Sequence, residues 1–296
     1  MKKKIDLSRP IGIIDVGSNS VRLLLTDGVF FNKSVITTRL GEGLSNSKYL
    51  TVDAIMRTVK AVEKLNNLAK ENNASKVYIF ATAAVRQSLN GNDFVSLVKD
   101  VTGLVVDVIS GDNEAELGIK GALNGEVGGI VDVGGASTEI AYFNGESTIY
   151  KKSLPMGVVR LHSQFERKQR EIEKFVLNTV KEYGETIPGS YKAIGGTATS
   201  LASIDLKLKV YDSSIVDGHF LTKNRLGEIA DELYSLSPNE IIELYAIQPQ
   251  RADIIAGGAT ILYEVCKHLN IDGFTVSEKD NLEGYLYHIQ NEKKGY

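Results

Sequence analysis

The hydrophobic pattern of this chain contains one segment twice, at residues 11–28 and 128–145. Aligned without a gap, IGIIDVGSNSVRLLLTDG and GGIVDVGGASTEIAYFNG are identical at seven of 18 positions. In both copies an apolar run leads into Asp-Val-Gly and a turn of small residues, and a second apolar run then reaches a turn pair, Asp27-Gly28 or Asn144-Gly145. This pattern predicts a β-hairpin followed by a second hairpin turn in each half of the chain.

A helical period follows each predicted hairpin. Residues 51–70 place apolar side chains at helical spacing from Ile55 to Leu65, and residues 76–82 form a short apolar run typical of a buried strand. The remaining predicted elements are strands at 104–110 and 191–196, and helices at 167–184, 251–269 and 281–294. Strands and helices in both halves predict an α/β fold of two lobes, each with a mixed sheet.

The boundary between the lobes is expected near residues 111–113, where a predicted strand ends and a helix begins. We therefore predict an N-terminal lobe at 1–112, a C-terminal lobe at 113–280, and a C-terminal helix at 281–296 that packs back on the N-terminal lobe. No low-complexity linker separates the lobes, so the expected arrangement is a shared cleft with hinge motion.

Composition narrows the classes of partner. With 296 residues and a net charge of −3, the chain has no overall positive field for DNA, RNA or an anionic membrane. The basic MKKK start lacks a following apolar stretch, so we expect a solvated tail and not a signal peptide. No run reaches the 18 or more apolar residues of a membrane span. Cys266 is the single cysteine, which excludes an internal disulfide and fits a reducing cytoplasm. We expect a cytoplasmic protein.

Three turns of small residues have the composition of phosphate-binding loops. DVGSNS and DVGGAS combine a glycine with small neighbours whose backbone N–H groups can converge on an anion, and GGTATS lies between a strand and a helix, where a helix N-terminus favours anions. The candidate phosphate-binding residues in these turns are Gly17, Ser18, Asn19, Ser20, Gly134, Gly135, Ala136, Ser137, Gly195, Gly196 and Thr197. GxxxxGK[ST], a strand-linked GxGxxG, HExxH and GxSxG are all absent from the sequence, which disfavours P-loop, dinucleotide, zinc-hydrolase and serine-hydrolase chemistry.

Acidic residues are then the candidates for catalysis. Asp15 and Asp132 each follow an apolar strand, where a carboxylate can hold a divalent ion or a water, although either can also simply shape an Asx-turn. Glu139 lies across the second turn from Asp132, and its alternative role is that of a surface carboxylate. In SGDNEAEL, Glu114 is either functional or part of a capped first helical turn.

Three arginines are candidates for neutralising phosphate charge. Arg22 follows the first turn, Arg86 follows a buried strand, and Arg160 follows PMGVV. Such positions suit bidentate contact with phosphate, and a surface ion pair is the alternative for each of them.

Taken together, the segments resemble the exopolyphosphatase/guanosine pentaphosphate phosphohydrolase (Ppx/GppA) family, a branch of the actin, Hsp70 and sugar kinase superfamily. The resemblance rests on IGIIDVGSNSVRLLL, ATAAVRQSLNG, VISGDNEAELGIKGAL, IVDVGGASTEIAYF, SLPMGVVRL, AIGGTATSLASI, RADIIAGGATIL and VSEKDNLEGYL, in that order. It implies two actin-like (ribonuclease H-like) lobes with the hydrolytic site in the cleft between them. It also implies Mg²⁺ or another divalent cation, with K⁺ as a further candidate.

The resemblance also implies roles for individual residues. It makes Glu114 the catalytic base and assigns Asp132 and Glu139 to metal or catalytic-water contacts. Asp15 stays a third candidate metal ligand because of its position after the first apolar strand. Arg86 and the glycines and serines of the two Asp-Val-Gly turns correspond to the phosphate-binding set.

Three departures from the family pattern stand out. Ala136 replaces a glycine of the second turn, Asn113 stands where another acid is common, and the chain ends without the C-terminal helical HD-like domain of the long members. We expect an exopolyphosphatase that releases terminal orthophosphate from inorganic polyphosphate by metal-assisted attack of water. The alternatives are a guanosine pentaphosphate (pppGpp) 5′-phosphohydrolase and a ppGpp-binding sensor. An ATP-dependent kinase of the same superfamily is a less favoured alternative. The sequence does not decide whether the protein forms a homodimer.

Overall fold

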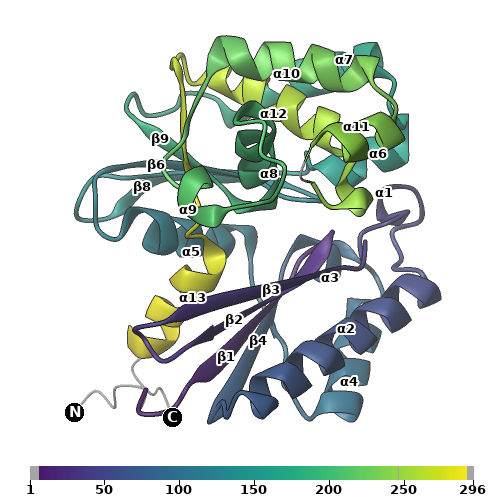
Figure 1. Ribbon diagram of the computed structural model, residues 1–296, viewed down its shortest axis with the longest axis vertical. Helices are drawn as coiled ribbons and strands as arrows, with labels where there is room; N and C mark the ends of the chain where they lie inside the picture. The colour runs from purple at the N-terminus through teal and green to yellow at the C-terminus, as the bar shows by residue number, and fades with distance from the viewer. Residues whose placement is uncertain (1–6, 246, 292–296) are drawn as a thin grey trace.

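The computed structural model describes residues 7–245 and 247–291, and it shows two lobes, one above the other in Figure 1. Each lobe is built around its own mixed β-sheet. The predicted fold class, α/β with two lobes and mixed sheets, is confirmed. Segment 1–4, predicted to be a solvated tail, and the end of the predicted last helix at 292–294 lie outside the described residues.

The N-terminal lobe holds a five-stranded sheet in the order β3-β2-β1-β4-β5. The first three strands pair antiparallel, and β4 and β5 continue the sheet in parallel with β1. Its elements are β1 (Ile11–Val16), β2 (Ser20–Thr26), β3 (Phe31–Thr37), α1 (Leu44–Ser47), α2 (Val52–Glu71), β4 (Lys76–Ala81), α3 (Ala83–Gln87), α4 (Gly91–Thr102) and β5 (Asp107–Val108).

The C-terminal lobe repeats this order in its own sheet, β10-β11-β9-β6-β7-β8, where β8-β7-β6-β9 corresponds to β3-β2-β1-β4. Its strands are β6 (Gly128–Val133), β7 (Thr138–Phe143), β8 (Thr148–Leu154), β9 (Tyr191–Ile194), β10 (Phe220–Thr222) and β11 (Gly273–Ser277). Its helices are α5 (Gly111–Leu123), α6 (Val158–Phe165), α7 (Gln169–Thr179), η1 (Val180–Tyr183), α8 (Gly195–Asp205), α9 (Ser213–Val216), α10 (Lys223–Ser235), α11 (Pro238–Leu244), η2 (Pro249–Arg251) and α12 (Ile255–His268). The chain then returns to the N-terminal lobe as α13 (Asn281–Asn291), beside the N-terminal sheet in Figure 1.

Strand alternation decides which face each acidic residue occupies. On β1, Ile14 and Val16 join the core under α2, whereas Ile13 joins the core under α13, so Asp15 points to the α13 face. On β6, Val131 and Val133 face the large C-terminal core, and Ile130 packs with α5. The carboxylate of Asp132 therefore faces α5.

Helices α5 and α13 cross at close range between the two sheets. A Cβ at Gly121 of α5 would collide with the carbonyl oxygen of Asp280, and one at Gly284 of α13 would collide with the carbonyl oxygen of Leu117. Glycine is needed at both positions because the two backbones nearly touch. The side chains of Leu282 and Leu286 then fill the core beneath β1 and β2.

Several predicted elements are shorter in the structure. The strand predicted at 104–110 is only β5, because this edge strand has β4 as its one neighbour and pairs with it at just Phe80 and Ala81. The helix predicted at 167–184 tightens into a 3₁₀ turn after Thr179, and the one predicted at 251–269 begins at Ile255. Gly195, predicted to end a strand, instead starts α8 with a φ of +79°. The lobe boundaries at 112 and 280 stay predictions.

None of the helices within 7–245 and 247–291 combines the length and the apolar character that crossing a membrane requires.

Candidate active site

The two related turns meet across a small cavity between the lobes. Each turn is closed by the same backbone hydrogen bond, from Gly17 N to Ser20 O (3.0 Å) and from Gly134 N to Ser137 O (2.9 Å). A Cβ at Gly135 would lie 2.9 Å from the Cβ of Ser18, so a side chain there would push the turns apart. The cavity measures about 90 Å³, enough for several waters or a terminal phosphate group.

Most of the residues predicted for the site line this cavity. The lining includes Asp15, Gly17, Ser18, Asn19, Ser20, Arg22, Glu114, Asp132, Gly134, Gly135, Ala136, Ser137, Gly195, Gly196 and Thr197. They come from both lobes and from four separate stretches of sequence, so the predicted phosphate-binding turns do converge on one space. Arg86 and Glu139 lie just outside the lining.

The third turn contributes the N-terminus of α8. This helix has 11 residues and starts at the cavity, where its free backbone N–H groups favour an anion. Thr197 donates its hydroxyl hydrogen bond to the carbonyl oxygen of Val133 (2.7 Å), which ties the start of α8 to the end of β6. A Cβ at Gly195 would lie 2.7 Å from Oδ1 of Asp132, so glycine lets this carboxylate oxygen reach the helix start.

Glu114 reaches the cavity from the first turn of α5. Ser110 caps the helix by accepting a hydrogen bond from the backbone N–H of Asn113 (3.1 Å), so the capping role predicted for this segment and the location of Glu114 at the site coexist. The Glu114 carboxylate is buried and receives Nη1 of Arg86 at 3.1 Å. Burial, followed by the nearby charge of Glu139, raises the pKa of Glu114 well above its ordinary value.

Asp132 and Glu139 are direct cross-strand partners on β6 and β7. Oδ2 of Asp132 accepts a hydrogen bond from Asn281 (2.9 Å), and Oε1 of Glu139 accepts one from Ser153 (2.6 Å). Burial is the main cause that raises the pKa of both carboxyl groups, and the charge of Glu139 adds to the rise at Asp132. The second hairpin therefore holds two acids side by side.

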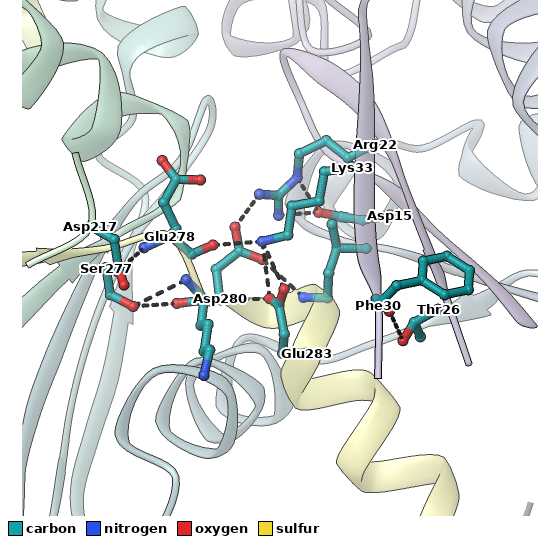
Figure 2. Close-up of polar contacts among 12 residues, drawn as sticks. Asp15, Arg22, Thr26, Phe30, Lys33, Asp217, Ser277, Glu278, Asp280 and Glu283 are labelled. Carbon is teal, nitrogen blue, oxygen red and sulfur yellow. Dashed lines mark hydrogen bonds and ion pairs between the residues drawn. The ribbon is translucent and has the colours of Figure 1, made fainter. Parts of the chain in front are cut away.

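The first hairpin has a cation at the matching position. Arg22 is the cross-strand partner of Asp15 and donates from Nε to its Oδ2 (3.0 Å), while Nη1 pairs with Asp280 (Figure 2). Burial raises the pKa of Asp15 despite this partner. Burial would also raise the pKa of Asp280, but the charges of Arg22 and Lys33 outweigh it and the pKa is lowered. Arg22 lines the cavity, yet two carboxylates already hold its guanidinium.

The three predicted metal ligands do not form a protein-only metal site. Within the described part of the chain, no three His, Cys, Asp or Glu side chains cluster closely enough to bind an ion. Oδ2 of Asp15 is instead hydrogen-bonded to Arg22. Oδ1 of Asp15 and Oε2 of Glu139 are nonetheless buried without a hydrogen-bond partner among the described residues. Mg²⁺ commonly binds through one or two carboxylates together with waters and substrate phosphates, and these oxygens fit that pattern.

Arg251 is a cavity residue that sequence reasoning missed. Its guanidinium lies against Gly196, where any side chain would collide with the guanidinium. Among the described residues, no carboxylate forms an ion pair with Arg251. Burial, followed by the charge of Arg22, lowers the pKa of Arg251 to about 10, so the side chain stays charged at neutral pH. The only signal was its place at the start of RADIIAGGATIL. It is the cavity's best-placed cation for phosphate.

The other two predicted arginines, Arg86 and Arg160, are not among the residues that line the cavity. Arg86 also donates to the carbonyl oxygen of Ile109 (2.7 Å), so its guanidinium connects Glu114 to the chain just before α5. Arg160 donates to the carbonyl oxygen of Ala136 (2.9 Å) and to Gln87 (2.6 Å) of the other lobe. Their geometry favours a role in positioning over direct contact with phosphate.

Glycine turns, a helix N-terminus and buried carboxylates from the two lobes surround one cavity, an arrangement suited to binding an anion. The model of the Ppx/GppA phosphatase family matches residues 29–293, and the chain belongs to this family.

Curated relatives support the same assignment. The chain is 31% identical to a bifunctional 3-dehydroquinate synthase/phosphatase of Fusobacterium nucleatum, over 92% of this chain, and 30% identical to exopolyphosphatase 2 of Mycobacterium tuberculosis, over 93%. It is 26% identical to guanosine-5′-triphosphate,3′-diphosphate pyrophosphatase of Photobacterium profundum, over 95%. It spans 45% of the Fusobacterium protein, 96% of the Mycobacterium protein and 59% of the Photobacterium protein.

Solved structures share the fold. The Ppx/GppA family member of Aquifex aeolicus has a TM-score of 0.77 at 26% identity, covering 96% of this chain and 99% of that one. An exopolyphosphatase from Cytophaga hutchinsonii has a TM-score of 0.84 at 23% identity, covering 96% and 98%, which shows the fold alone.

Proposed function

We propose that this protein is an exopolyphosphatase that releases terminal orthophosphate from inorganic polyphosphate. The observation that carries the proposal is that groups suited to binding an anion and buried carboxylates line one cavity. Three glycine-containing turns and Arg251, which forms no ion pair among the described residues, line the same cavity as the buried carboxylates of Glu114 and Asp132. The cations and N–H groups bind a terminal phosphate, and the carboxylates act on the water that attacks it.

In the proposed reaction, water attacks the terminal phosphorus and Glu114 accepts its proton. The new P–O bond forms to the water oxygen as the bond to the bridging oxygen breaks, which yields orthophosphate and a polyphosphate shorter by one unit. The turn N–H groups and Arg251 stabilise the charge on the phosphoryl oxygens, the main source of catalysis in phosphoryl transfer. Arg86 keeps Glu114 oriented.

A divalent cation, for which we propose Mg²⁺, completes the site. Asp132 would hold it, with the unpartnered oxygens of Glu139 and Asp15 as further ligands or as acceptors for its waters. When bound, the ion neutralises phosphate charge and polarises the phosphoryl group.

The deciding assay measures orthophosphate release from polyphosphates of defined length beside pppGpp, with and without Mg²⁺. We expect release from polyphosphate without any acceptor, and loss of release when Mg²⁺ is chelated. Release from neither substrate at any Mg²⁺ concentration would overturn the proposal.

The second candidate is pppGpp hydrolysis, because one relative is a guanosine-5′-triphosphate,3′-diphosphate pyrophosphatase. Both substrates present a terminal phosphoanhydride, and the cavity of about 90 Å³ holds only that end. Faster turnover of pppGpp in the same assay would select this function. Tight ppGpp binding without turnover would indicate a sensor, and ADP formed from ATP only with an acceptor would indicate a kinase.

We further propose that the protein works in the cytoplasm, as a homodimer, without DNA, RNA or a membrane as partner. The net charge of −3 and the single, buried Cys266 support the first and third points. The exposed side chains of Val29, in the turn before β3, and of Phe31 and Val35 on this edge strand support the second. Light scattering of the purified protein tests the dimer.

A further inference from the structure

The segment Asp280-Asn281-Leu282-Glu283 joins the two lobes, and every one of its side chains is engaged. Oδ1 of Asp280 accepts the backbone N–H of Leu282 (3.0 Å), and Glu283 accepts the backbone N–H of Asp280 (2.9 Å). These two hydrogen bonds cap the start of α13. The segment is therefore a rigid helix start rather than a loose linker.

Toward the N-terminal lobe, the segment is held by two cations from neighbouring strands. Arg22 of β2 pairs with Asp280, and Lys33 of β3 pairs with Glu283 (2.9 Å) and with the carbonyl oxygen of Glu278 (Figure 2). Arg22 also holds Asp15, so Asp280 is connected to the first Asp-Val-Gly turn through one guanidinium.

Toward the C-terminal lobe, Asn281 reaches the second turn. Its Nδ2 donates to Oδ2 of Asp132 at 2.9 Å, and its side chain is 3% exposed. This hydrogen bond favours the ionised form of Asp132, because an ionised carboxylate only accepts hydrogen bonds. A Cβ at Gly118 would lie 3.2 Å from Oδ1 of Asn281, so the absence of a side chain on α5 leaves room for this amide.

The hydrogen bond also selects which oxygen of Asp132 is free. Oδ2 is occupied by Asn281, and Oδ1 lies at the start of α8 beside Gly195, on the cavity wall. Two adjacent residues, Asp280 and Asn281, thus connect to the carboxylates of both related turns.

We propose that Asp280 and Asn281 are positioning residues for hydrolysis, which set the separation of the two turns and aim Oδ1 of Asp132 at the cavity. This inference rests on the proposed function for its kinetic readout. It assigns a purpose to the segment VSEKDNLEGYL that no catalytic role accounts for.

The test at Asn281 compares an isosteric change with a truncation. Asn281→Asp keeps the shape and removes the donor, whereas Asn281→Ala removes both; Asn291→Ala, an exposed asparagine of the same helix, is the matched control. Partners that orient catalytic carboxylates typically contribute 10–100-fold, so we expect kcat on polyphosphate to fall by about that factor in Asn281→Ala, with KM nearly unchanged. Asn281→Asp should lose at least as much.

A packing role for Asn281 predicts the opposite order, with Asn281→Asp close to the wild type and Asn281→Ala impaired. That order, or a kcat for Asn281→Ala equal to that of Asn291→Ala, would overturn the proposal. Thermal unfolding of each variant, measured beside the kinetics, confirms that the assayed protein is folded.

At Asp280, the variants separate capping from positioning. Asn is a good N-cap, so Asp280→Asn keeps the helix cap and removes the charge that holds Arg22, whereas Asp280→Ala removes both. We expect kcat to fall in both variants and the melting temperature to fall more in Asp280→Ala. Normal kcat in Asp280→Asn would make Asp280 only a cap.

Hydrogen exchange keeps the inference testable if the proposed function fails. Should the wild type hydrolyse neither polyphosphate nor pppGpp, the amides of 132–137 must still exchange faster in Asn281→Ala than in Asn291→Ala. Unchanged exchange in that turn would show that Asn281 does not hold it.

Discussion

The two hairpins of this molecule share a backbone and differ in charge. Each places Asp-Val-Gly at the end of a central strand and closes its turn with the same hydrogen bond. The strand registers also match, with Asp15 opposite Arg22 and Asp132 opposite Glu139. One position of the repeat is therefore arginine in the first hairpin and glutamate in the second.

That one difference gives the two hairpins different electrostatic environments. In the first hairpin, Arg22 forms ion pairs with both Asp15 and Asp280. In the second, Asp132 lies beside Glu139 and Glu114 approaches from α5. Burial raises the pKa values of all three carboxyl groups, and the charge of Glu139 adds to the rise at Glu114 and Asp132. Perturbed carboxyl groups of this kind are typical of catalytic sites.

The largest expected effect comes from removing the base that faces the second hairpin. Glu114→Gln keeps the size and polarity of the side chain but cannot accept the proton, so we expect kcat to fall about 10²–10⁴-fold. Phosphate release from polyphosphate measures the loss. Asp112→Asn, an exposed acid in the same helical turn, is the control. Near-normal release by folded Glu114→Gln would exclude Glu114 as the base.

The next effect tests the first hairpin as a structural element. Arg22→Met leaves Asp15 and Asp280 buried without their shared cation, which should lower the free energy of unfolding by about 3–5 kcal/mol. Arg57→Met, which breaks an exposed ion pair with Glu42, should cost less than about 1 kcal/mol. Chemical denaturation of both variants measures the difference.

The loss in Arg22→Met should depend on pH with a definite sign. In the wild type the pKa of Asp280 is lowered in the fold, so its contribution to stability is present at neutral pH and lost as pH falls through the folded-state pKa. Without Arg22 the folded-state pKa values of both aspartates rise, so the variant loses stability as pH rises. The gap between the two proteins should therefore narrow toward about pH 4. A gap that is constant with pH would contradict the proposed neutralisation.

A smaller effect is expected from neutralising the acid that distinguishes the second hairpin. Glu139→Gln keeps the contact with Ser153 possible and should lower kcat about 10–100-fold, with Glu146→Gln, an exposed glutamate beyond the same hairpin, as the control. Burial and then Glu139 raise the pKa of Glu114 above about 4.5, its ordinary value, and Glu114 must be ionised to accept a proton. The acid limb of kcat/KM should therefore move to lower pH in Glu139→Gln. If the acid limb does not move, the charge of Glu139 does not affect the ionisation of Glu114 during catalysis.

The repeat made the two hairpins and their turns predictable from the sequence, but not the residues that these turns contact. Local patterns fix the two hairpins, the three small-residue turns and the capped start of α5, because each depends on neighbours within a few residues. The partners of these turns could not be predicted, since Arg22 meets Asp280 258 residues later and Asp132 meets Asn281 149 residues later. Those contacts exist because the glycines of α5 and α13 let two helices cross closely, and glycine in a helix gives no sign of which helix it will meet.

The smallest expected effect concerns the composition of the second turn. Ala136 stands where the family pattern has glycine; it has no positive φ and its methyl group is buried, so alanine fits the backbone without strain. Ala136→Gly should leave kcat nearly unchanged and lower the free energy of unfolding by about 0.4–1 kcal/mol, because glycine gives the unfolded chain more freedom. Gly135→Ala is the informative counterpart, since its Cβ would press on Ser18 of the first turn. If the two hairpins must touch to form the cavity, Gly135→Ala lowers kcat while Ala136→Gly does not; equal activities would mean that hydrolysis tolerates a wider separation of the turns.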